Sequence, residues 1–251
     1  MGELTSLEKL WSFIKGFILL NIIWIIGSFL MDTRSLPMPG KVYLNLPTLF
    51  ENGFYVHILA SLYRIFVGLL ISFTIGSLVG LLMGYSKRCN KLLNPLVYFV
   101  YPVPKTALLP VVMTLYGLGD NSKIVIIVLI TVFQVIVSVR DAVLNVEGEL
   151  YNPLISLGAN RWQLFLHVTF PAILSEVLTN IRLSIGTAFS VLFFAEAYGT
   201  KQGLGYFIQD SWSRINYIDM YSGIVVLSLV GLILFILIDY LESICCRYKR
   251  N

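Results

Sequence analysis

The sequence predicts an all-α, polytopic membrane protein with six transmembrane helices. Of its 251 residues, 57% are hydrophobic and 13% are charged, whereas a soluble domain holds roughly 25% charged residues. The mean hydropathy is +0.81. A helix needs about 20 apolar residues to cross the hydrocarbon core of a bilayer. Six stretches are suitable for this: 13–31, 58–84, 92–117, 123–139, 172–197 and 220–241.

The first apolar stretch, 13–31, is too long for a signal-peptide core and lacks a small-residue cleavage site, so we expect it to be retained. Before it, Leu4, Leu7 and Trp11 recur at helical spacing between charged residues. This pattern predicts an amphipathic helix over residues 1–12 that lies on the membrane surface. An extension of the first span is the alternative interpretation.

The distribution of basic residues predicts the orientation of the chain, because cytosolic loops carry an excess of Lys and Arg. With the N-terminus in the cytosol, the inner side or boundary holds Lys9, Lys15, Lys87, Arg88, Lys91, Arg140, Arg161, Arg247, Lys249 and Arg250. The outer side then holds Arg34, Lys41, Lys123, Lys201 and Arg214. Both termini and the segment 140–171 are therefore expected in the cytosol, and the loops 32–57 and 198–219 outside.

We expect a single membrane domain over residues 1–251, with spans two to six forming a core five-helix unit, 58–241. One face of the second span is lined by small residues at intervals of four: Gly68, Ser72, Gly76, Gly80 and Gly84. Positions four apart share a helix face, and such stripes let two helices approach closely in lipid. The stripe predicts tight helix packing. The general excess of glycine in membrane helices is the alternative interpretation.

The third span contains four prolines, Pro95, Pro102, Pro104 and Pro110. Proline removes a backbone donor and clashes with the preceding turn, so this helix must be kinked or broken. Broken backbone at membrane depth is tolerated where it is buried in protein or lines a wet cavity. Lys105 lies at the same place, although an ammonium near mid-membrane costs roughly 2.5–3.5 kcal/mol. Together these features predict a translocation pathway, with a lysine that snorkels to an interface as the alternative.

Three further ionisable residues, Arg64, Arg182 and Glu196, fall within the predicted spans. Such residues face the interior of a bundle. The arginines can brace helices through carbonyls or a carboxylate, and Glu196 can pair with one of them or face the pathway. With Lys105 and the aromatic Tyr101, they make up our candidate pathway set.

No enzyme active site is recognisable in the sequence. The two histidines, His57 and His167, fall on opposite predicted sides of the membrane, and the three cysteines form neither a CxxC pair nor a metal-ligand spacing. The HExxH, GxSxG and phosphate-loop motifs are absent. We therefore expect no catalysis, no bound metal and no phosphate-loop ATP site. The net charge of +4 fits membrane orientation better than a nucleic-acid partner.

A polar segment, 140–171, interrupts the apolar spans. Gly158 divides it into two short helical parts, and Asn160 is a suitable N-cap for the second. Trp162 with Arg161 beside it suits a groove on a protein, because Trp and Arg are favoured interface anchors. We therefore predict a compact knob for a partner protein. Its candidate contact residues are Glu149, Asn152, Leu154, Leu157, Gly158, Ala159, Asn160, Arg161, Trp162 and Pro171.

This segment resembles the cytosolic signature of the permease subunits of bacterial ABC importers. That signature reads Glu-Ala-Ala, three residues, Gly, nine residues, Ile, one residue, Leu-Pro. Here Gly158 is followed by nine residues and then by Val168, Thr169, Phe170 and Pro171, so the frame fits without a gap. The departure is at the front, where residues 152–154 read Asn-Pro-Leu. It puts the specific contacts of the Glu-Ala-Ala triplet in doubt, although not the loop geometry.

Two other segments, "PVPKTALLP" and "AEAYGTKQGLGYFI", resemble the nitrate, sulfonate and taurine branch of these permeases, which also includes importers of pyrimidine vitamin precursors. The resemblance extends from about Leu36 to Ile238. It implies a type I importer permease fold in the bacterial inner membrane and a second permease copy. It also implies cytosolic ABC ATPase subunits that use ATP and Mg²⁺ and grip the 150–170 loop, and an external binding protein. The implied substrate is a small anion or a pyrimidine-type vitamin precursor.

Two other classes of membrane protein are the alternatives to an ABC importer permease. An ion-coupled secondary transporter would use intramembrane carboxylates, often with repeat symmetry, and only Glu196 qualifies. An integral membrane enzyme would need clustered His, Asp, Ser or metal ligands within the spans, and the sequence contains no such cluster.

Overall fold

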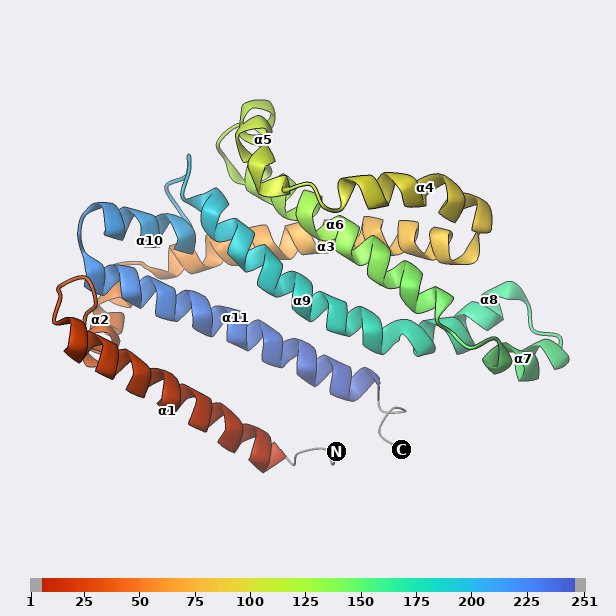
Figure 1. Ribbon diagram of the computed structural model, residues 1–251, viewed down its shortest axis with the longest axis horizontal. Helices are drawn as coiled ribbons and strands as arrows, with labels where there is room; N and C mark the ends of the chain where they lie inside the picture. The colour runs from red at the N-terminus through yellow and green to blue at the C-terminus, as the bar shows by residue number, and fades with distance from the viewer. Residues whose placement is uncertain (1–5, 247–251) are drawn as a thin grey trace.

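The computed structural model describes residues 6–246, and this part of the chain consists of helices and loops without strands (Figure 1). Its α-helices are α1 (Ser6–Met31), α2 (Pro39–Glu51), α3 (Tyr55–Tyr85), α4 (Lys87–Val100), α5 (Leu109–Tyr116), α6 (Asp120–Leu144), α7 (Asn152–Ser156), α8 (Arg161–Leu164), α9 (Phe170–Glu196), α10 (Leu204–Ser213) and α11 (Tyr217–Cys245). Three further turns are helical but not α-helical. They are the 3₁₀ turns η1 (Lys105–Leu108) and η2 (Gly148–Tyr151), and the π-helical turn η3 (Phe165–Thr169).

The described residues contain five helical segments long and apolar enough to cross a membrane. They are α1, α3, α6, the continuous segment from α8 to α9, and α11. A sixth candidate is α4 together with η1 and α5, two parts bent by 79° at a short break. The six predicted spans and the predicted break in the third are therefore found.

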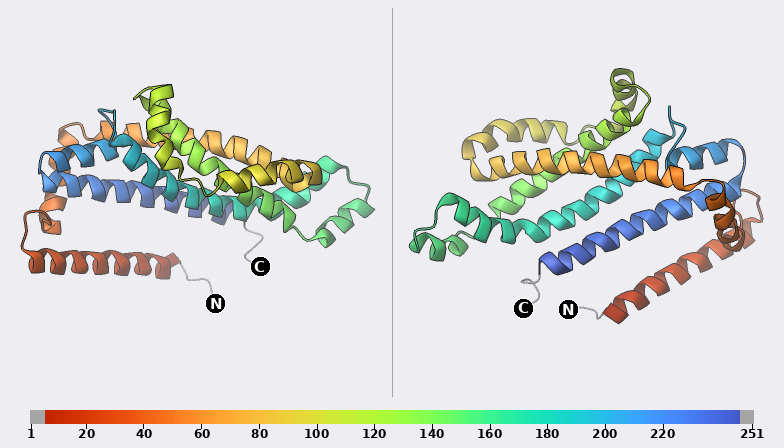
Figure 2. Two further views of the ribbon diagram at one scale, coloured as in Figure 1. Left: turned by 45° about the horizontal axis from the view of Figure 1, so that its top comes forward. Right: turned by 180° about the vertical axis from the view of Figure 1, so that it is seen from behind.

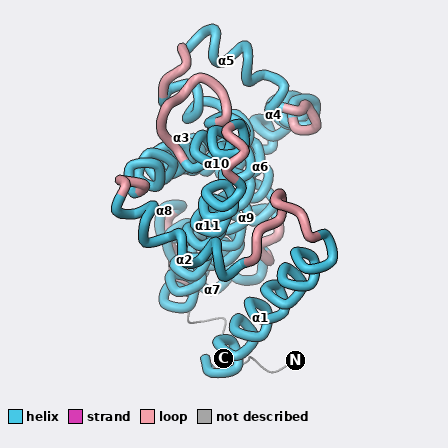
Figure 3. Tube along the Cα trace, turned by 90° about the vertical axis from the view of Figure 1, so that its left-hand side faces the viewer, coloured by secondary structure: helices cyan, strands magenta, loops and turns pink. Residues whose placement is uncertain are grey.

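Helices α3, α6 and α9 form the centre of the bundle (Figures 1 and 2). Their buried side chains make one apolar cluster: Ile65, Ile127, Ile185, Ala188, Phe189 and Leu192. Helix α11 packs against this cluster from the α9 side, and α1 lies beyond α11 at the edge of the molecule. Seen along the bundle, α1 and α5 occupy opposite edges (Figure 3).

The small-residue face of α3 packs directly on α6. A Cβ atom added at a glycine of this face would lie only 2.7 or 2.8 Å from a β-branched side chain of α6. The four glycines are Gly68, Gly76, Gly80 and Gly84. The fifth member, Ser72, donates a hydrogen bond to the carbonyl of Gly68 (2.8 Å) and accepts one from Thr131 of α6 (2.6 Å). Larger residues would push α3 and α6 apart.

The third span breaks between α4 and η1, at Pro102 and Pro104. Neither proline can donate a backbone hydrogen bond, so the carbonyls of Tyr98 and Val100 have no α-helical donor four residues on. At this break the neighbouring carbonyl of Tyr101 accepts a hydrogen bond from the ammonium of Lys105 (2.5 Å). The same ammonium lies 5.5 Å from the ring centroid of Tyr101 and 5.3 Å from that of Phe133 on α6. Lys105 thus stabilises the break, and it is itself buried.

Two helices at one end of the bundle, α2 and α10, lie within the loops expected at 32–57 and 198–219. Both are too short to span a membrane, so an analysis based on span length does not detect them. They pack on the start of α11 and close this end of the bundle (Figures 1 and 2). We call it the α2–α10 end, and the opposite one the loop end.

The first span differs from the expected pattern at its start. The amphipathic helix expected over residues 1–12 lies partly outside the described residues. From Ser6 onwards the backbone continues without interruption into the membrane-spanning part of α1, which agrees with the alternative of an extended first span. The surface position of residues 1–12 stays a prediction.

The fifth span begins earlier than residue 172. Helix α8 continues through η3 into α9, so one helical segment extends from Arg161 to Glu196. Pro171 does not end the polar segment, as its position suggested, but occupies the first turn of α9. A proline has no backbone N–H, so Pro171 cannot donate the α-helical hydrogen bond to the carbonyl four residues before it. The π-helical turn η3 directly precedes α9, in which Pro171 lies.

Candidate functional site

The predicted partner-binding segment projects from the loop end of the bundle, where α7 and α8 form a hairpin beyond the long helices (Figures 1 and 2). Gly158 connects the two helices with a φ of +79°. The amides of Gly158 and Ala159 donate to the carbonyls of Ile155 (2.9 Å) and Leu154 (3.0 Å), which closes the end of α7. A Cβ atom at Gly158 would meet nothing within 4 Å. The glycine is therefore required by backbone conformation rather than by space.

Asn160 is the N-cap of α8, as the sequence predicted. Its side-chain oxygen accepts a hydrogen bond from the amide of Gln163 (2.9 Å), and the Gln163 side chain accepts one from the amide of Asn160 (2.8 Å). This reciprocal pair is a capping box, which satisfies two amides at the helix start. The turn at Gly158 and this cap together fix the direction of α8.

The hairpin exposes apolar side chains. Leu157 is 85% exposed and Trp162 is 67% exposed, and Ile155 is also exposed. Arg161 lies on the surface beside Trp162. Of the ten predicted contact residues, the structure gathers nine in η2, α7, α8 and their connection. The tenth, Pro171, is half-buried in α9.

Near the α2–α10 end, the structure pairs Arg64 with Glu196, at 3% and 1% exposure. The Arg64 guanidinium donates to Glu196 (2.6 Å) and to Asp120 at the start of α6 (2.8 Å). The Glu196 carboxylate also accepts from the hydroxyl of Ser61 (2.8 Å) and the amide of Gly205 (2.8 Å). We call these five residues the Arg64 cluster. Its hydrogen bonds connect α3, α6, α9 and α10.

The turn before α10 fits closely around Glu196. Gly203 has a φ of +127°, and a Cβ atom there would lie 2.3 Å from the carboxylate carbon of Glu196. A Cβ atom at Gly205 would lie 2.6 Å from the carbonyl oxygen of Phe193. The two glycines of "QGLGYF" therefore let the chain approach the buried carboxylate. Sequence analysis did not assign them this role, although their spacing is a visible signal.

Arg182 lies elsewhere, between α9 and α11. Its guanidinium pairs with Glu242 (2.8 Å) and with Asp239. The predicted pathway set is thus divided among three places: Arg64 with Glu196, Tyr101 with Lys105, and Arg182 with carboxylates of α11. The sequence did not indicate the partners of these arginines and of Glu196, which are Ser61, Asp120, Asp239 and Glu242.

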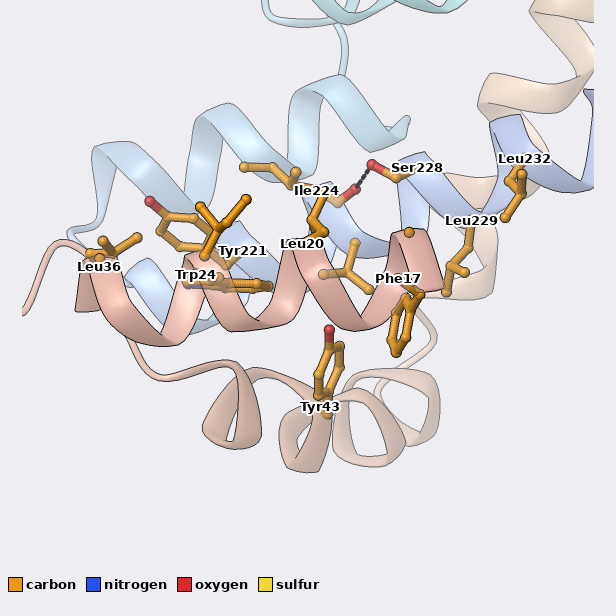
Figure 4. Close-up of a pocket in the computed structure, with 14 residues that line it drawn as sticks. Phe17, Leu20, Trp24, Leu36, Tyr43, Tyr221, Ile224, Ser228, Leu229 and Leu232 are labelled. Atoms are coloured by element: carbon orange, nitrogen blue, oxygen red, sulfur yellow. Dashed lines mark hydrogen bonds between the residues drawn. The ribbon is translucent and has the colours of Figure 1, made fainter. Parts of the chain in front are cut away.

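Two cavities between the helices are apolar. One of about 980 Å³ lies between α1, α2 and α11, where Trp24 faces Tyr221 and Tyr43 of α2 lies beneath α1 (Figure 4). The other, of about 560 Å³, lies between α9 and α11 and is lined by four phenylalanines. Neither is lined by a residue of the predicted pathway set. Within residues 6–246, no group of three or more His, Cys, Asp or Glu is placed to hold a metal ion.

Comparisons with known proteins identify the family. The profile of the family described as binding-protein-dependent transport system inner membrane component matches residues 72–244. The chain is 28% identical to the formylaminopyrimidine transport permease protein of Halalkalibacterium halodurans, over 94% of both chains. It is 31% identical to the taurine transport system permease protein of Escherichia coli, over 86% of this chain and 82% of the relative. The nitrate import permease protein of Leptolyngbya laminosa is 27% identical, over 77% and 69%.

Solved structures share the fold. A structure of the inward-facing MetNI methionine ABC transporter aligns with a TM-score of 0.66 at 20% identity, over 75% of this chain and 94% of that one. A bacterial ABC transporter that imports the acidic polysaccharide alginate aligns with a TM-score of 0.65 at 19% identity, over 94% and 99%. With a family match over more than half of its length, this chain belongs to the inner-membrane permease family of binding-protein-dependent ABC transport systems, whose members are transport subunits and not enzymes.

Proposed function

We propose that this chain forms the substrate pathway of an ATP-driven, binding-protein-dependent importer and couples to cytosolic ATPase subunits through the 150–170 loop. The observation that carries the proposal is the hairpin of α7 and α8. It exposes Leu157 and Trp162 on a backbone held by the Gly158 turn and the Asn160 capping box. A rigid surface with an aromatic anchor beside an arginine suits a groove on a partner protein.

In this proposal the loop end faces the cytosol, together with both chain termini, because the Lys and Arg residues of the connecting segments favour that orientation. ATP and Mg²⁺ would be bound by the partner ATPase and not by this chain. The external binding protein would deliver substrate to the α2–α10 end. Closure of the ATPases on ATP would move the hairpin as a lever and switch the bundle between inward-open and outward-open states.

A second copy of the chain would complete the pathway. Helices α4 and α5 project large apolar side chains, among them Tyr98, Phe99 and Leu115, which are all strongly exposed. Exposed apolar surface of this kind is compatible with lipid or with another subunit. These two helices are the two parts of the broken third span. Broken backbone at membrane depth requires cover by protein or a wet cavity. Pairing of two such faces would enclose the break and Tyr101.

The substrate we propose is a small sulfonate-like or nitrate-like anion, or a pyrimidine-type vitamin precursor. Relatives that carry taurine, nitrate and formylaminopyrimidine in their names support this range. Among the basic residues of the pathway set, Arg64 and Arg182 are neutralised by carboxylates. Lys105 makes no ion pair with the described carboxylates. Its ammonium donates a hydrogen bond to the carbonyl of Tyr101 instead. It is therefore the basic group best suited to an anion, and aromatic Tyr101 beside it suits a heterocycle.

The alternative of an ion-coupled secondary transporter gains no support from Glu196. Its carboxylate accepts hydrogen bonds from Arg64, Ser61 and Gly205 and is 1% exposed. An ion site would need a carboxylate that is open to the pathway and free to change partners.

Uptake by right-side-out membrane vesicles tests the proposal. Vesicles with the complete transport system would be loaded with ATP and given labelled taurine, methanesulfonate, nitrate or formylaminopyrimidine with the external binding protein. We expect one probe to accumulate only with internal ATP. Arg161→Ala with Trp162→Ala should reduce this uptake by at least about tenfold, because losing interface anchors of this kind costs about 2 kcal/mol or more.

A matched control exists at the opposite end of the bundle. Trp212 and Arg214 are also an exposed Trp and Arg pair, in and directly after α10. Changing both to Ala should leave the ATPase contact intact, and the readout of this control is co-purification of the ATPase rather than uptake, because the external binding protein would dock at this end. Uptake of a probe that follows an ion gradient and ignores internal ATP would contradict the proposal and favour the secondary transporter.

A further inference from the structure

Three hydroxyl groups join the hairpin to two long helices. Tyr85, at the end of α3, and Tyr151, in η2, both hydrogen-bond to the hydroxyl of Thr169. The oxygen–oxygen distance from Tyr151 to Thr169 is 2.9 Å. Thr169 is fully buried at the end of η3, where α9 begins. One buried hydroxyl therefore connects the partner-binding loop, α3 and α9.

An aromatic contact path follows the same route. The ring of exposed Trp162 lies 5.5 Å from that of Phe165, measured between centroids. Phe165 in turn lies 6.4 Å from Tyr85 of α3 and 6.2 Å from Phe170 of α9. These separations are within the range of favourable aromatic pairs. Ring contacts through Phe165 thus connect Trp162, in the proposed ATPase contact, to α3 and to α9.

The turn that holds Thr169 is itself unusual. η3 is π-helical over five residues, Phe165–Thr169, between the α-helical segments α8 and α9. A π-turn inserts an extra residue into a helix and is found frequently at functional sites. Helix α8 is therefore joined to α9 through an interruption of the regular α-helix. The hydroxyl bonds of Tyr85 and Tyr151 attach the end of this turn to α3 and to the loop.

We infer that Tyr85, Tyr151 and Thr169 are positioning residues that transmit movement of the hairpin into α3 and α9. The inference rests on the proposed function, since it supposes that ATPase subunits move the hairpin. With the hydroxyl bonds present, a displacement of α8 moves the ends of both helices. Without them, the π-turn absorbs the displacement locally.

Hydrogen–deuterium exchange tests the inference without a transport substrate. The complex of permease and ATPase would be compared with and without ATP plus vanadate. In the wild type, nucleotide should change exchange in the loop, 148–164, and also at the helix ends, 78–85 and 165–176. In the double variant Tyr85→Phe with Tyr151→Phe, the response at the helix ends should fall about fivefold, the scale expected for losing a net hydrogen bond. The loop response should persist.

Two controls separate transmission from general loosening of the fold. Tyr43→Phe also removes one tyrosine hydrogen bond, the 2.7 Å bond to Asn21 between α1 and α2, and should leave the nucleotide response unchanged. Thr169→Ser keeps the hydroxyl and should behave as the wild type, whereas Thr169→Val should reproduce the tyrosine double variant.

An undiminished helix-end response in the Tyr85 and Tyr151 double variant would overturn the inference while leaving the proposed function intact. An equal loss in the Tyr43 control would overturn it as well, because the effect would then be nonspecific. If the wild-type loop itself shows no response to nucleotide, the proposed function fails, and the inference fails with it.

Discussion

At the scale of single residues, the Arg64 cluster joins buried charges from several helices. The Arg64 guanidinium is buried and bonded to two carboxylates, and Glu196 is bonded in turn to Ser61 and Gly205. Removing one partner of a buried ion pair typically costs about 3–5 kcal/mol, because the remaining charge is left uncompensated. The cluster therefore fixes α10 to the adjacent ends of α3, α6 and α9. The Arg182 pairs are more exposed, and exposed pairs contribute little to stability.

Gly203→Ala should destabilise the protein more than Gly117→Ala. Both glycines have backbone angles that are essentially restricted to glycine, φ +127° with ψ 154° and φ +80° with ψ −180°. Each substitution should therefore cost about 1–3 kcal/mol of backbone strain. At Gly203 the new Cβ also meets the carboxylate of Glu196, whereas at Gly117 it meets nothing within 4 Å. The measurement is the thermal unfolding midpoint of each purified variant in detergent.

A lower midpoint for Gly203→Ala than for Gly117→Ala is the expected order. Equal midpoints would mean that the fit of the turn around Glu196 adds nothing to stability.

At the scale of elements, the third span shows how an unfavourable sequence feature is stabilised locally. Pro102 and Pro104 interrupt the helix, and the ammonium of Lys105 then binds the carbonyl of Tyr101. The rings of Tyr101 and Phe133 lie over the same charge, and aromatic faces attract cations most when both are desolvated. One lysine thus supplies a side-chain donor to a carbonyl at the break, where the helical ladder is interrupted.

The α7–α8 hairpin depends on a backbone conformation that only Gly158 adopts readily. Gly158→Val should leave the protein inserted but uncouple ATP hydrolysis from uptake, because a β-branched residue at φ +79° costs roughly 1–2 kcal/mol or more and redirects α8. Gly148→Val is the matched control, since a Cβ atom there also meets nothing within 4 Å and its φ is not positive. The measurement is probe uptake per ATP hydrolysed in the vesicle assay.

We expect the ratio of uptake to hydrolysis to fall several-fold for Gly158→Val and to stay at the wild-type value for Gly148→Val, a difference that corresponds to about 1 kcal/mol or more. Normal uptake by Gly158→Val would exclude the lever role of the hairpin.

At the scale of the whole molecule, the bundle has two ends of different construction. The α2–α10 end is closed by two short helices and the Arg64 cluster, and the loop end carries the hairpin of α7 and α8 (Figure 1). Between them, α3 and α6 are held in close contact by the glycine stripe. This closely packed pair begins near the Arg64 cluster and ends beside the hydroxyl of Tyr85, so it connects the two ends.

Features that depend on local sequence could be predicted. Span positions follow from apolar length, the break from Pro102 and Pro104, and the start of α8 from the capping residue Asn160. Features that depend on tertiary contacts could not. Sequence analysis left open whether Glu196 pairs with Arg64, with Arg182 or with neither, and only the structure shows that it meets Arg64, 132 positions away. Asp120 meets Arg64 across 56 positions, and nothing local in the sequence indicates that contact. The π-turn before α9 has no residue signature, and Pro171 alone suggested a helix end instead.

To test whether this chain is the permease of an ATP-driven importer, the solubilised chain would be purified from its native membrane and the co-eluting proteins identified by mass spectrometry. We expect an ABC ATPase in stoichiometric amount, which is lost from the Arg161→Ala and Trp162→Ala double variant and retained by the Trp212→Ala and Arg214→Ala control. A chain that elutes without an ATPase, and still moves solute in vesicles lacking ATP, would show that the importer proposal is wrong.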